Sequence, residues 1–230
     1  NQSLNFMKNY FIKISILFLA VSFASCSNDD SSPSTTNTEF FNINVGSRWV
    51  YKKYDFDFSN PGVYTFSGQT ETVEVTEIVT INGFTFSKLK HIKTFENNSN
   101  PVIEYEFLRI DEQGHLRSIY AGTDETMEHF VVNEGFVQHP GTDSGFQFVQ
   151  EYPWGTINYS LAGETTMSVE NNNYRVLPYK GVFIPTDPDS ASKTVEYNYQ
   201  AQVGLVKRVC HAAFSNYSWE DRLVSYTLVP

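Results

Sequence analysis

An imidazole, a carboxylate and a hydroxyl lie close together in the sequence, at His139, Asp143 and Ser144. Side chains of these three types form the catalytic triad of many hydrolases when packed elements hold them at fixed distances. Here all three fall within six residues of a segment that also contains Gly141 and Gly145, and a glycine-containing loop rarely provides that geometry. The segment therefore does not predict an active site, and the sequence contains no Gly-x-Ser-x-Gly nucleophile motif.

The remaining side chains that could ligate a metal do not show a metal-binding spacing. Most of the five histidines are expected on surface strands and turns; they are His91, His115, His129, His139 and His211. The segment Asp187–Ala191 carries oxygen ligands of the kind that Ca²⁺ prefers, but it lacks the spacing of an EF-hand loop. We therefore expect no metal and no other cofactor.

The densest acidic cluster consists of Glu104, Glu106, Asp111 and Glu112. Two carboxyl groups in a cleft can hydrolyse glycosides, so this cluster is the nearest candidate for enzyme chemistry. Alternation along the chain instead predicts that these residues form the solvated face of a strand and the turn after it. No catalytic residue is predicted, and the sequence favours a protein that is not an enzyme.

Tyr152 and Trp154 are the candidate ligand-facing aromatic residues. The segment Glu151–Gly155 has the composition of a loop, where a large ring needs either a ligand or a packing partner. Two interpretations stay open: the rings contact a ligand, or they anchor the loop.

The N-terminal segment has the pattern of a signal peptide. A basic stretch precedes an apolar run over Ile14–Ala24, which is too short to span a membrane as a permanent helix. The run ends in Phe23-Ala24-Ser25-Cys26, which resembles the bacterial lipobox, whose cysteine takes up diacylglycerol. We predict a signal peptide over residues 1–25 and lipidation of Cys26. Residues 1–6 precede the first Met, which indicates an over-extended reading frame or a different start codon.

Residues 26–38 are predicted to form the acylated cysteine and a disordered polar tether. Ser27–Thr38 contains no aliphatic residue and cannot bury enough apolar surface to fold. A flexible stretch of this length spans roughly 20 Å. The predicted partner is the membrane, through the lipid anchor, and the predicted location is the outer membrane. Ser27–Asp30 resembles the acidic signals that send lipoproteins to the cell surface, which favours surface display.

Composition excludes nucleic acid as a partner and favours strands over helices. The 230 residues include 26 acidic and 16 basic side chains, a net charge of −10, whereas phosphate binding needs a cationic face. Aromatic residues make up 16% of the chain, which is typical of sheet proteins. Cys210 is a single thiol once Cys26 is lipidated, and its strand context predicts a small buried apolar side chain.

Residues 39–230 are predicted to form a single β domain. Thr72–Ile81 alternates, with its valines and Ile81 predicted on one face, and Asn82-Gly83 predicts a type I′ turn into a returning strand over Phe84–Phe95. The predicted cross-strand pairs are Ile81 with Phe84, Val79 with Phe86, Glu77 with Lys88 and Val73 with Ile92.

A second hairpin is predicted around Asp111–Gly114, between Val102–Ile110 and His115–Tyr120. Further predicted strands are Arg48–Phe58, Met127–Gln138, Thr156–Leu161, Thr165–Val169, Tyr174–Leu177, Val195–Ala201, Leu205–Phe214 and Arg222–Leu228. The fold class is therefore all-β, a single curved antiparallel sheet or a partial half-barrel, following a lipoprotein signal peptide.

Four short segments resemble a loose group of lipoproteins from the Bacteroidetes. They are Phe41–Tyr51, with its Gly-x-x-Trp-x-Tyr pattern, Leu177–Phe183, Val203–Lys207, with its Gly-Leu-Val-Lys pattern, and Leu223–Tyr226. The resemblance covers most of residues 40–228 and implies an all-β domain with a curved sheet, by analogy like the half-barrels of lipoprotein carriers. Many members of the group are uncharacterised, so the resemblance carries over no catalytic residue.

Ser190 is a candidate for O-glycosylation. Asp189-Ser190-Ala191 resembles the Asp-Ser/Thr-small apolar sequon for O-glycosylation of exported Bacteroidetes proteins, and the surrounding polar segment predicts an exposed loop.

Three functions remain in competition. The first is a membrane-anchored, non-catalytic binding or structural lipoprotein of the cell envelope, whose partner is a glycan, a lipid or another envelope protein. The second is an extracellular glycan-active hydrolase, and the third is a half-barrel that carries a lipid in its concave face. A concave apolar cavity would favour the carrier, an open aromatic platform would favour glycan binding, and two carboxyls about 5–9 Å apart in a cleft would favour a glycosidase.

Overall fold

The computed structural model describes residues 40–57, 59–60, 62–126, 135–187, 189–211 and 217–230. These residues form thirteen strands and no helix. The strands are β1 (Arg48–Phe56), β2 (Tyr64–Ile81), β3 (Phe84–Phe95), β4 (Asn98–Ile110), β5 (Leu116–Gly122), β6 (Phe136–His139), β7 (Gln147–Tyr152), β8 (Gly155–Leu161), β9 (Thr165–Val169), β10 (Asn172–Pro185), β11 (Lys193–Gln200), β12 (Gly204–His211) and β13 (Ser218–Thr227). The predicted signal peptide, Cys26, the tether and the predicted strand positions 127–134 lie outside the described residues.

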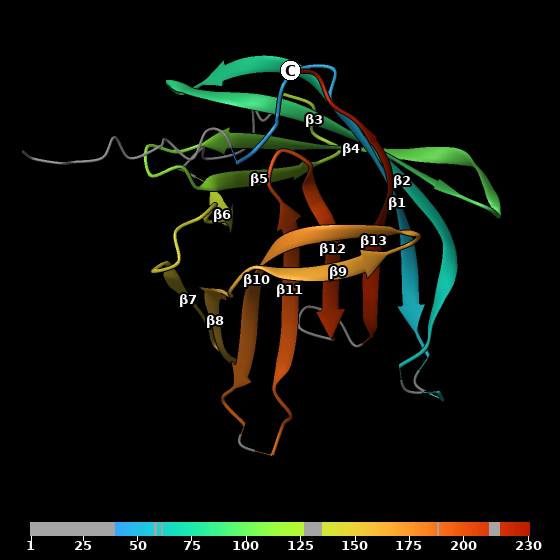
Figure 1. The fold of residues 1–230 in the computed structure, drawn as a ribbon, viewed down its shortest axis with the longest axis vertical. Helices are drawn as coiled ribbons and strands as arrows, with labels where there is room; N and C mark the ends of the chain where they lie inside the picture. The colour runs from blue at the N-terminus through green and yellow to red at the C-terminus, as the bar shows by residue number, and fades with distance from the viewer. Residues whose placement is uncertain (1–39, 58, 61, 127–134, 188, 212–216) are drawn as a thin grey trace, which may run out of the picture. The chain divides into compact units, whose positions relative to one another are not determined.

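The strands form one antiparallel sheet whose order is β6-β5-β4-β3-β2-β1-β13-β12-β11-β10-β8-β7, with β9 paired to the first part of β10 (Figure 1). This confirms the predicted all-β fold class. The sheet curves until its two ends meet through side chains: Phe136 of β6 lies 5.5 Å from Tyr159 of β8 and 6.0 Å from Phe148 of β7, measured between ring centroids. No ladder pairs β6 with β7 among the described residues, so the sheet is a partial barrel.

The β2–β3 hairpin forms around the predicted turn. Asn82 and Gly83 both have positive φ, 50° and 83°, as a type I′ turn requires. The predicted pairs Ile81–Phe84, Val79–Phe86 and Glu77–Lys88 are confirmed. Val73, however, lies opposite His91 rather than Ile92.

An irregularity between Val75 and Glu77 explains this difference. An extra residue in one strand reverses the alternation of the side chains that follow it. Val73 and Val75 therefore pack in the largest core cluster, whereas Val79 and Ile81 pack against Phe86 in a separate cluster. The prediction that all four lie on one face was wrong.

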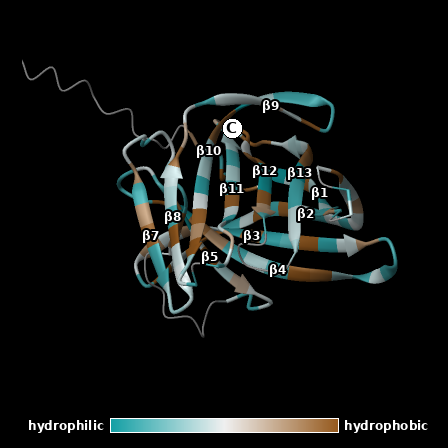
Figure 2. Ribbon diagram, turned by 90° about the horizontal axis from the view of Figure 1, so that it is seen from below, coloured by the Kyte–Doolittle hydropathy of each residue, from teal (hydrophilic) through white to brown (hydrophobic). Residues whose placement is uncertain are grey.

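Figure 2 shows hydrophilic and hydrophobic residues following one another along the strands, and successive side chains of a strand point to opposite faces of the sheet. The concave face carries the aromatic residues Trp49 and Tyr51, which share one face of β1 as expected for residues two positions apart. On the outer face the β9–β10 hairpin is fixed by Glu170 at its tip, which accepts a hydrogen bond of 2.8 Å from the Tyr54 hydroxyl.

The segment Phe40–Gly46 closes one end of the partial barrel. Its backbone accepts hydrogen bonds from Gln202 N and Ser87 Oγ and donates one to Val75 O, each 2.8 Å long. These contacts tie the segment to β2, to β3 and to the turn before β12. The concave space is therefore blocked at the end from which β1 begins.

The two short sequence patterns meet in space at this end. Trp49 Nε1 donates a hydrogen bond of 2.6 Å to Val203 O, and the Tyr51 hydroxyl donates one of 2.9 Å to Leu205 O. The Trp-x-Tyr pattern thus holds the start of the Gly-Leu-Val-Lys strand across 154 residues of sequence. Both patterns have a structural role in the fold.

The prediction of a loop over Glu151–Gly155 was wrong. Tyr152 ends β7 and Gly155 begins β8, so only two residues connect the strands. Gly155 is required at this place, because a Cβ there would lie 2.4 Å from Ile184 O and its φ is +153°. The strand β7 itself is missing from the sequence prediction because its outward residues include the exposed Val149, which weakens the alternation.

Candidate functional site

The concave face contains a cavity of about 470 Å³, within the usual range of small-molecule sites. Its wall comes from the closing segment and from strands β1 to β6 and β11 to β13. Aromatic and aliphatic side chains make up much of the lining: Phe41, Ile43, Trp49, Tyr51, Val73, Leu89, Leu108, Leu116, Tyr120, Phe136, Tyr197, Tyr199, Leu205 and Trp219.

The polarity of the lining changes in the same direction along neighbouring strands. On β1 to β5 the lining residue nearest the closed end is apolar, and polar residues or tyrosines follow at two-residue steps, the spacing that keeps side chains on one face. The series are Trp49, Tyr51 and Lys53 on β1; Val73, Glu71 and Gln69 on β2; Leu89, His91 and Lys93 on β3; Leu108 and Glu106 on β4; and Leu116, Ser118 and Tyr120 on β5. On β6 and β13 the order is reversed, because Phe136 and Trp219 lie farther from the closed end than Gln138 and Asp221. Along β1 to β5 the cavity therefore has an apolar floor, a charged middle belt and a rim of polar side chains and Tyr120, to which β13 adds the Trp219 ring.

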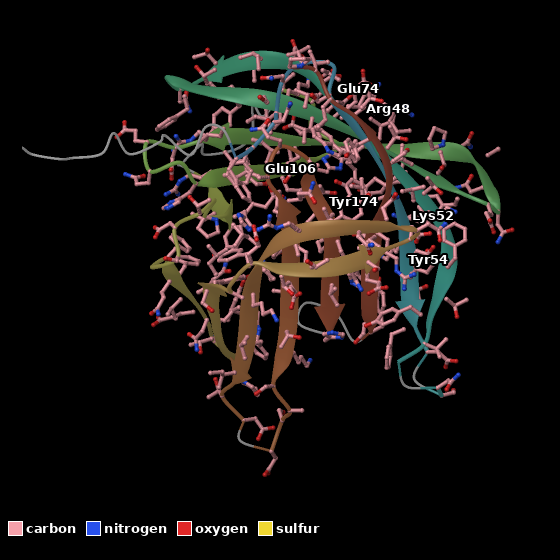
Figure 3. The ribbon with its side chains drawn as sticks, viewed as in Figure 1. Arg48, Lys52, Tyr54, Glu74, Glu106 and Tyr174 are labelled. Atoms are coloured by element: carbon pink, nitrogen blue, oxygen red, sulfur yellow. The ribbon has the colours of Figure 1, made fainter. Side chains whose placement is uncertain are left out.

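The middle belt is built around His91, which lies between two carboxylates. His91 Nδ1 lies 2.9 Å from Glu71 Oε1, and His91 Nε2 lies 3.2 Å from Glu106 Oε2. The first contact is a hydrogen bond, and the second is an ion-pair contact without hydrogen-bond geometry. Ser118 Oγ also donates a hydrogen bond to Glu106. Figure 3 labels Glu106 among the strands of the sheet.

Electrostatics keeps all three groups charged at neutral pH. Burial alone would lower the pKa of His91, but its close contacts with the carboxylates of Glu106 and Glu71 override burial and raise it to about 9. Burial alone would likewise raise the pKa of both carboxyls, and the contact with His91 instead lowers the pKa of each below its ordinary value. The belt therefore places one imidazolium between two carboxylates, a net charge of −1, and the charge of Arg208 also helps to lower the pKa of both carboxyls.

Two further ion pairs lie at the belt and the rim. Arg208 donates from Nε and Nη2 to one oxygen of Asp221, at 3.0 and 2.6 Å. Lys93 pairs with Glu104. Lys53 contacts rings instead, with its Nζ 4.6 Å from the centroid of Trp219.

Two tyrosine hydroxyls in the wall are left for a ligand or water. Tyr197 and Tyr199 both line the cavity, and burial is the largest cause that raises the pKa of each. Within the part of the chain that the structure describes, neither hydroxyl has a hydrogen-bond partner. A tyrosine hydroxyl in a buried setting usually finds a partner, so these two groups are available to bind one.

The sequence-predicted aromatic pair lies outside this cavity. Tyr152 and Trp154 stack with ring centroids 5.3 Å apart and an interplanar angle of 19°, at the turn between β7 and β8. Trp154 is 63% exposed, while Tyr152 packs against the cluster around Tyr159. Contact with a ligand stays a prediction for this pair.

Of the two predicted modification sites, Ser190 lies among the described residues and Cys26 does not. Ser190 is exposed in the segment between β10 and β11, and its hydroxyl donates a hydrogen bond of 3.0 Å to Asp187 Oδ2. Its glycosylation stays a prediction. Cys26 lies outside the described residues, so its lipidation also stays a prediction. Cys210 is fully buried with a free thiol, as the strand context indicated.

Several charged or titratable residues that were predicted at the surface are buried. Glu106 is only 9% exposed and Asp111 is 9% exposed, because the concave face excludes solvent from one and Arg117 and the backbone of the β4–β5 turn bind the other. The prediction of a solvated acidic cluster was therefore wrong for these two carboxylates.

The histidines likewise depart from the surface prediction. His139 is fully buried, its Nε2 lies 3.0 Å from Leu177 O, and burial lowers its pKa to about 4, so it is neutral. His115 is also buried, 3.3 Å from Asp143. His91 lies in the cavity wall, whereas His211 is exposed and His129 lies outside the described residues. Whether each of these histidines is buried or exposed depends on the side of the sheet that it faces.

The described residues contain no cluster of three or more His, Cys, Asp or Glu side chains arranged to hold a metal ion. Across the same residues, no helix has the length and apolar character needed to cross a membrane.

Comparisons with known proteins give similarity in structure alone. No family model matches the chain, and no curated protein matches it. Two solved structures are similar. One is a Bacteroides fragilis protein inferred to be exported, with a YmcC-like fold, at a TM-score of 0.47 and 9% identity. The other is an inferred lipoprotein from Parabacteroides distasonis, at a TM-score of 0.37 and 13% identity. Each covers 82% of this chain and 98% of its own.

Sequence reasoning did not find the cavity residues. The signal was present in the two-residue steps that mix apolar and charged residues on one face, as in Leu89, His91 and Lys93. Alternation alone assigns such charges to solvent, because it cannot show that the sheet curves around them.

Proposed function

We propose that this chain is an exported, lipid-anchored protein of the outer membrane that binds a small ligand with an apolar portion in its concave cavity. The observation that carries this proposal is the graded lining, with an apolar floor at the closed end and polar groups towards the rim. A cavity of about 470 Å³ with an apolar interior and a few polar groups is typical of a binding site.

The chemistry of the belt favours binding over glycoside hydrolysis. A glycosidase needs one carboxyl group with a raised pKa that donates a proton. Here the pKa of both Glu71 and Glu106 is lowered, and both ring nitrogens of His91 face these carboxylates. Neither carboxyl group therefore has the raised pKa that a proton donor needs.

The binding proposal is tested by titrating the protein with an apolar fluorescent probe whose emission rises when it leaves water. Saturable binding of one probe per chain, reversed by competing single-chain amphiphiles, would support it. Emission that rises linearly with probe concentration, without saturation, would contradict it.

The anchor is supported by the short apolar run and the small residues before Cys26. Replacing Cys26 with Ala removes the thiol that forms the thioether, so the variant is expected to leave the membrane fraction, because the polar tether offers no substitute anchor. Fractionation of cells measures this, with Cys210→Ala as the control that keeps the lipobox. Retention of C26A in the membrane with a processed N-terminus would show that the proposed anchor is wrong.

A further inference from the structure

We propose that the ligand is a single-chain amphiphile with one anionic head group, a carboxylate or a phosphate monoester, whose head lies at Lys53 and whose chain points to the closed end. This proposal rests on the proposed binding function and names the class of ligand.

The orientation follows from the lining. The floor near the closing segment is formed by Trp49, Val73 and Leu89, where an uncompensated charge would be costly. Polar groups increase towards Lys53 and Gln69, at the opposite end of the same face. An amphiphile therefore gains most when its chain occupies the floor and its head stays at the rim.

The charge of the head follows from the pairing of the charged lining residues. Both belt carboxylates contact the single imidazolium of His91, and the carboxylate of Asp221 pairs with Arg208. Each of these three acids therefore already has a cationic contact. Among the cations of the lining, Arg208, His91 and Lys93 each have an acidic partner.

Lys53 is the exception. In the described part of the chain no carboxylate pairs with its ammonium group, which instead lies over the rings of Trp219 and Tyr217, at 4.6 and 5.7 Å. Lys53 is half-buried, and an ammonium group beside apolar rings attracts an anion more strongly than one in bulk water. It is the group best suited to hold an anionic head.

Neutral donors lie in the same part of the wall. Tyr197, Arg208, Asp221 and Lys53 are successive cross-strand partners on four adjacent strands, β11, β12, β13 and β1. The Tyr197 hydroxyl has no partner within the described residues, and neither does that of Tyr199, two residues further along β11. Phenolic hydroxyls donate well to carboxylate and phosphate oxygens, so the row offers both a charge and hydrogen bonds.

The test compares four probes of equal chain length: dodecanoate, dodecyl phosphate, dodecanol and dodecylamine. Each is titrated into the full protein and into Lys53→Gln by displacement of the fluorescent probe. Wild type is expected to bind the two anions about tenfold more tightly than the alcohol, and K53Q to lose this preference, as for one charge-assisted contact. The alcohol should bind both proteins equally.

Lys52→Gln is the matched control, because Lys52 is the adjacent residue of β1 and faces the outer side, near the tip of the β9–β10 hairpin (Figure 3). It is expected to keep the preference for anions. Charge reversal in Lys53→Glu should shift the preference to dodecylamine and gives a second readout if K53Q is less stable.

The outcomes separate this proposal from the proposed function. Equal binding of the alcohol and the anions to wild type, or an unchanged preference in K53Q, would overturn the anionic head and leave the binding function in place. Failure of all four probes to displace the fluorophore would overturn both. A preference of wild type for dodecylamine would reverse the assigned charge.

Discussion

Replacing His91 with Gln is expected to lower the free energy of unfolding by about 3–5 kcal/mol at neutral pH, the usual cost of removing one partner from a buried ion pair. The substitution leaves Glu71 and Glu106 in the cavity wall without the cation between them. Glutamine can hydrogen bond to one carboxylate but carries no charge, so two like charges remain close together in a medium of low dielectric constant.

The pH dependence of stability also reports the contribution of the His91 ion pairs. The pKa of His91 is raised from 6.5 to about 9 in the folded state. Its contribution is therefore complete below about pH 6.5 and is lost as the pH rises through about 9. The pKa values of Glu71 and Glu106 are lowered, so their contribution is present above their ordinary pKa and is lost in acid. The H91Q variant should lack the alkaline loss.

Urea unfolding across this pH range measures both effects. His211→Gln is the matched control, because His211 is exposed and the change should alter stability by no more than about 0.5 kcal/mol. Adding Glu106→Gln to H91Q should recover part of the lost stability, since the second amide removes one of the two charges. A loss of less than about 1 kcal/mol in H91Q, with the alkaline decline unchanged, would show that the charge of His91 does not stabilise the carboxylates of Glu71 and Glu106 as described.

Filling the cavity floor is expected to abolish ligand binding. Leu108 is a floor residue on β4, and Leu108→Trp places a larger ring in the space that the apolar chain of the ligand would occupy. We expect affinity for dodecanoate to fall by about 100-fold or more, equivalent to about 2.7 kcal/mol. Displacement of the fluorescent probe measures this loss directly.

Two further variants make this result interpretable. Ile103→Trp introduces the same ring on the outer face of β4, where Ile103 is 37% exposed, and should bind as wild type does. Leu205→Trp enters the cavity from β12 and replaces L108W if that variant is too unstable to measure. Binding by both cavity variants at wild-type affinity would place the ligand elsewhere on the molecule.

The sequence contained enough information for the strands but not for the site. The Asn82-Gly83 turn and the alternation of Thr72–Val75 predict local structure, because backbone conformation and side-chain direction depend on neighbouring residues. The bulge after Val75 depends on packing across the whole sheet, so the faces of Val79 and Ile81 were predicted incorrectly.

The cavity depends on curvature, which no local pattern reports. Glu106 and His91 alternate with apolar residues as solvated strand residues do, and only the return of β6 towards β8 encloses the space that they face. The Trp49 and Tyr51 pattern was recognised as structural, and its role became clear when both side chains proved to bind the β12 segment. Local sequence therefore predicts the strands and turns, but it does not predict the cavity, because the cavity forms only when distant strands close the sheet.

Native mass spectrometry of the protein purified from the cells that produce it is the most direct test of ligand binding in the concave cavity. After gentle removal of the detergent, the wild-type protein is expected to carry one noncovalent ligand per chain, released at higher collision energy as an anion with an apolar chain. The L108W variant from the same cells should lack this mass, while I103W should retain it. Wild-type protein with no ligand beyond its covalent lipid, or the same ligand on L108W as on wild type, would contradict ligand binding in the concave cavity.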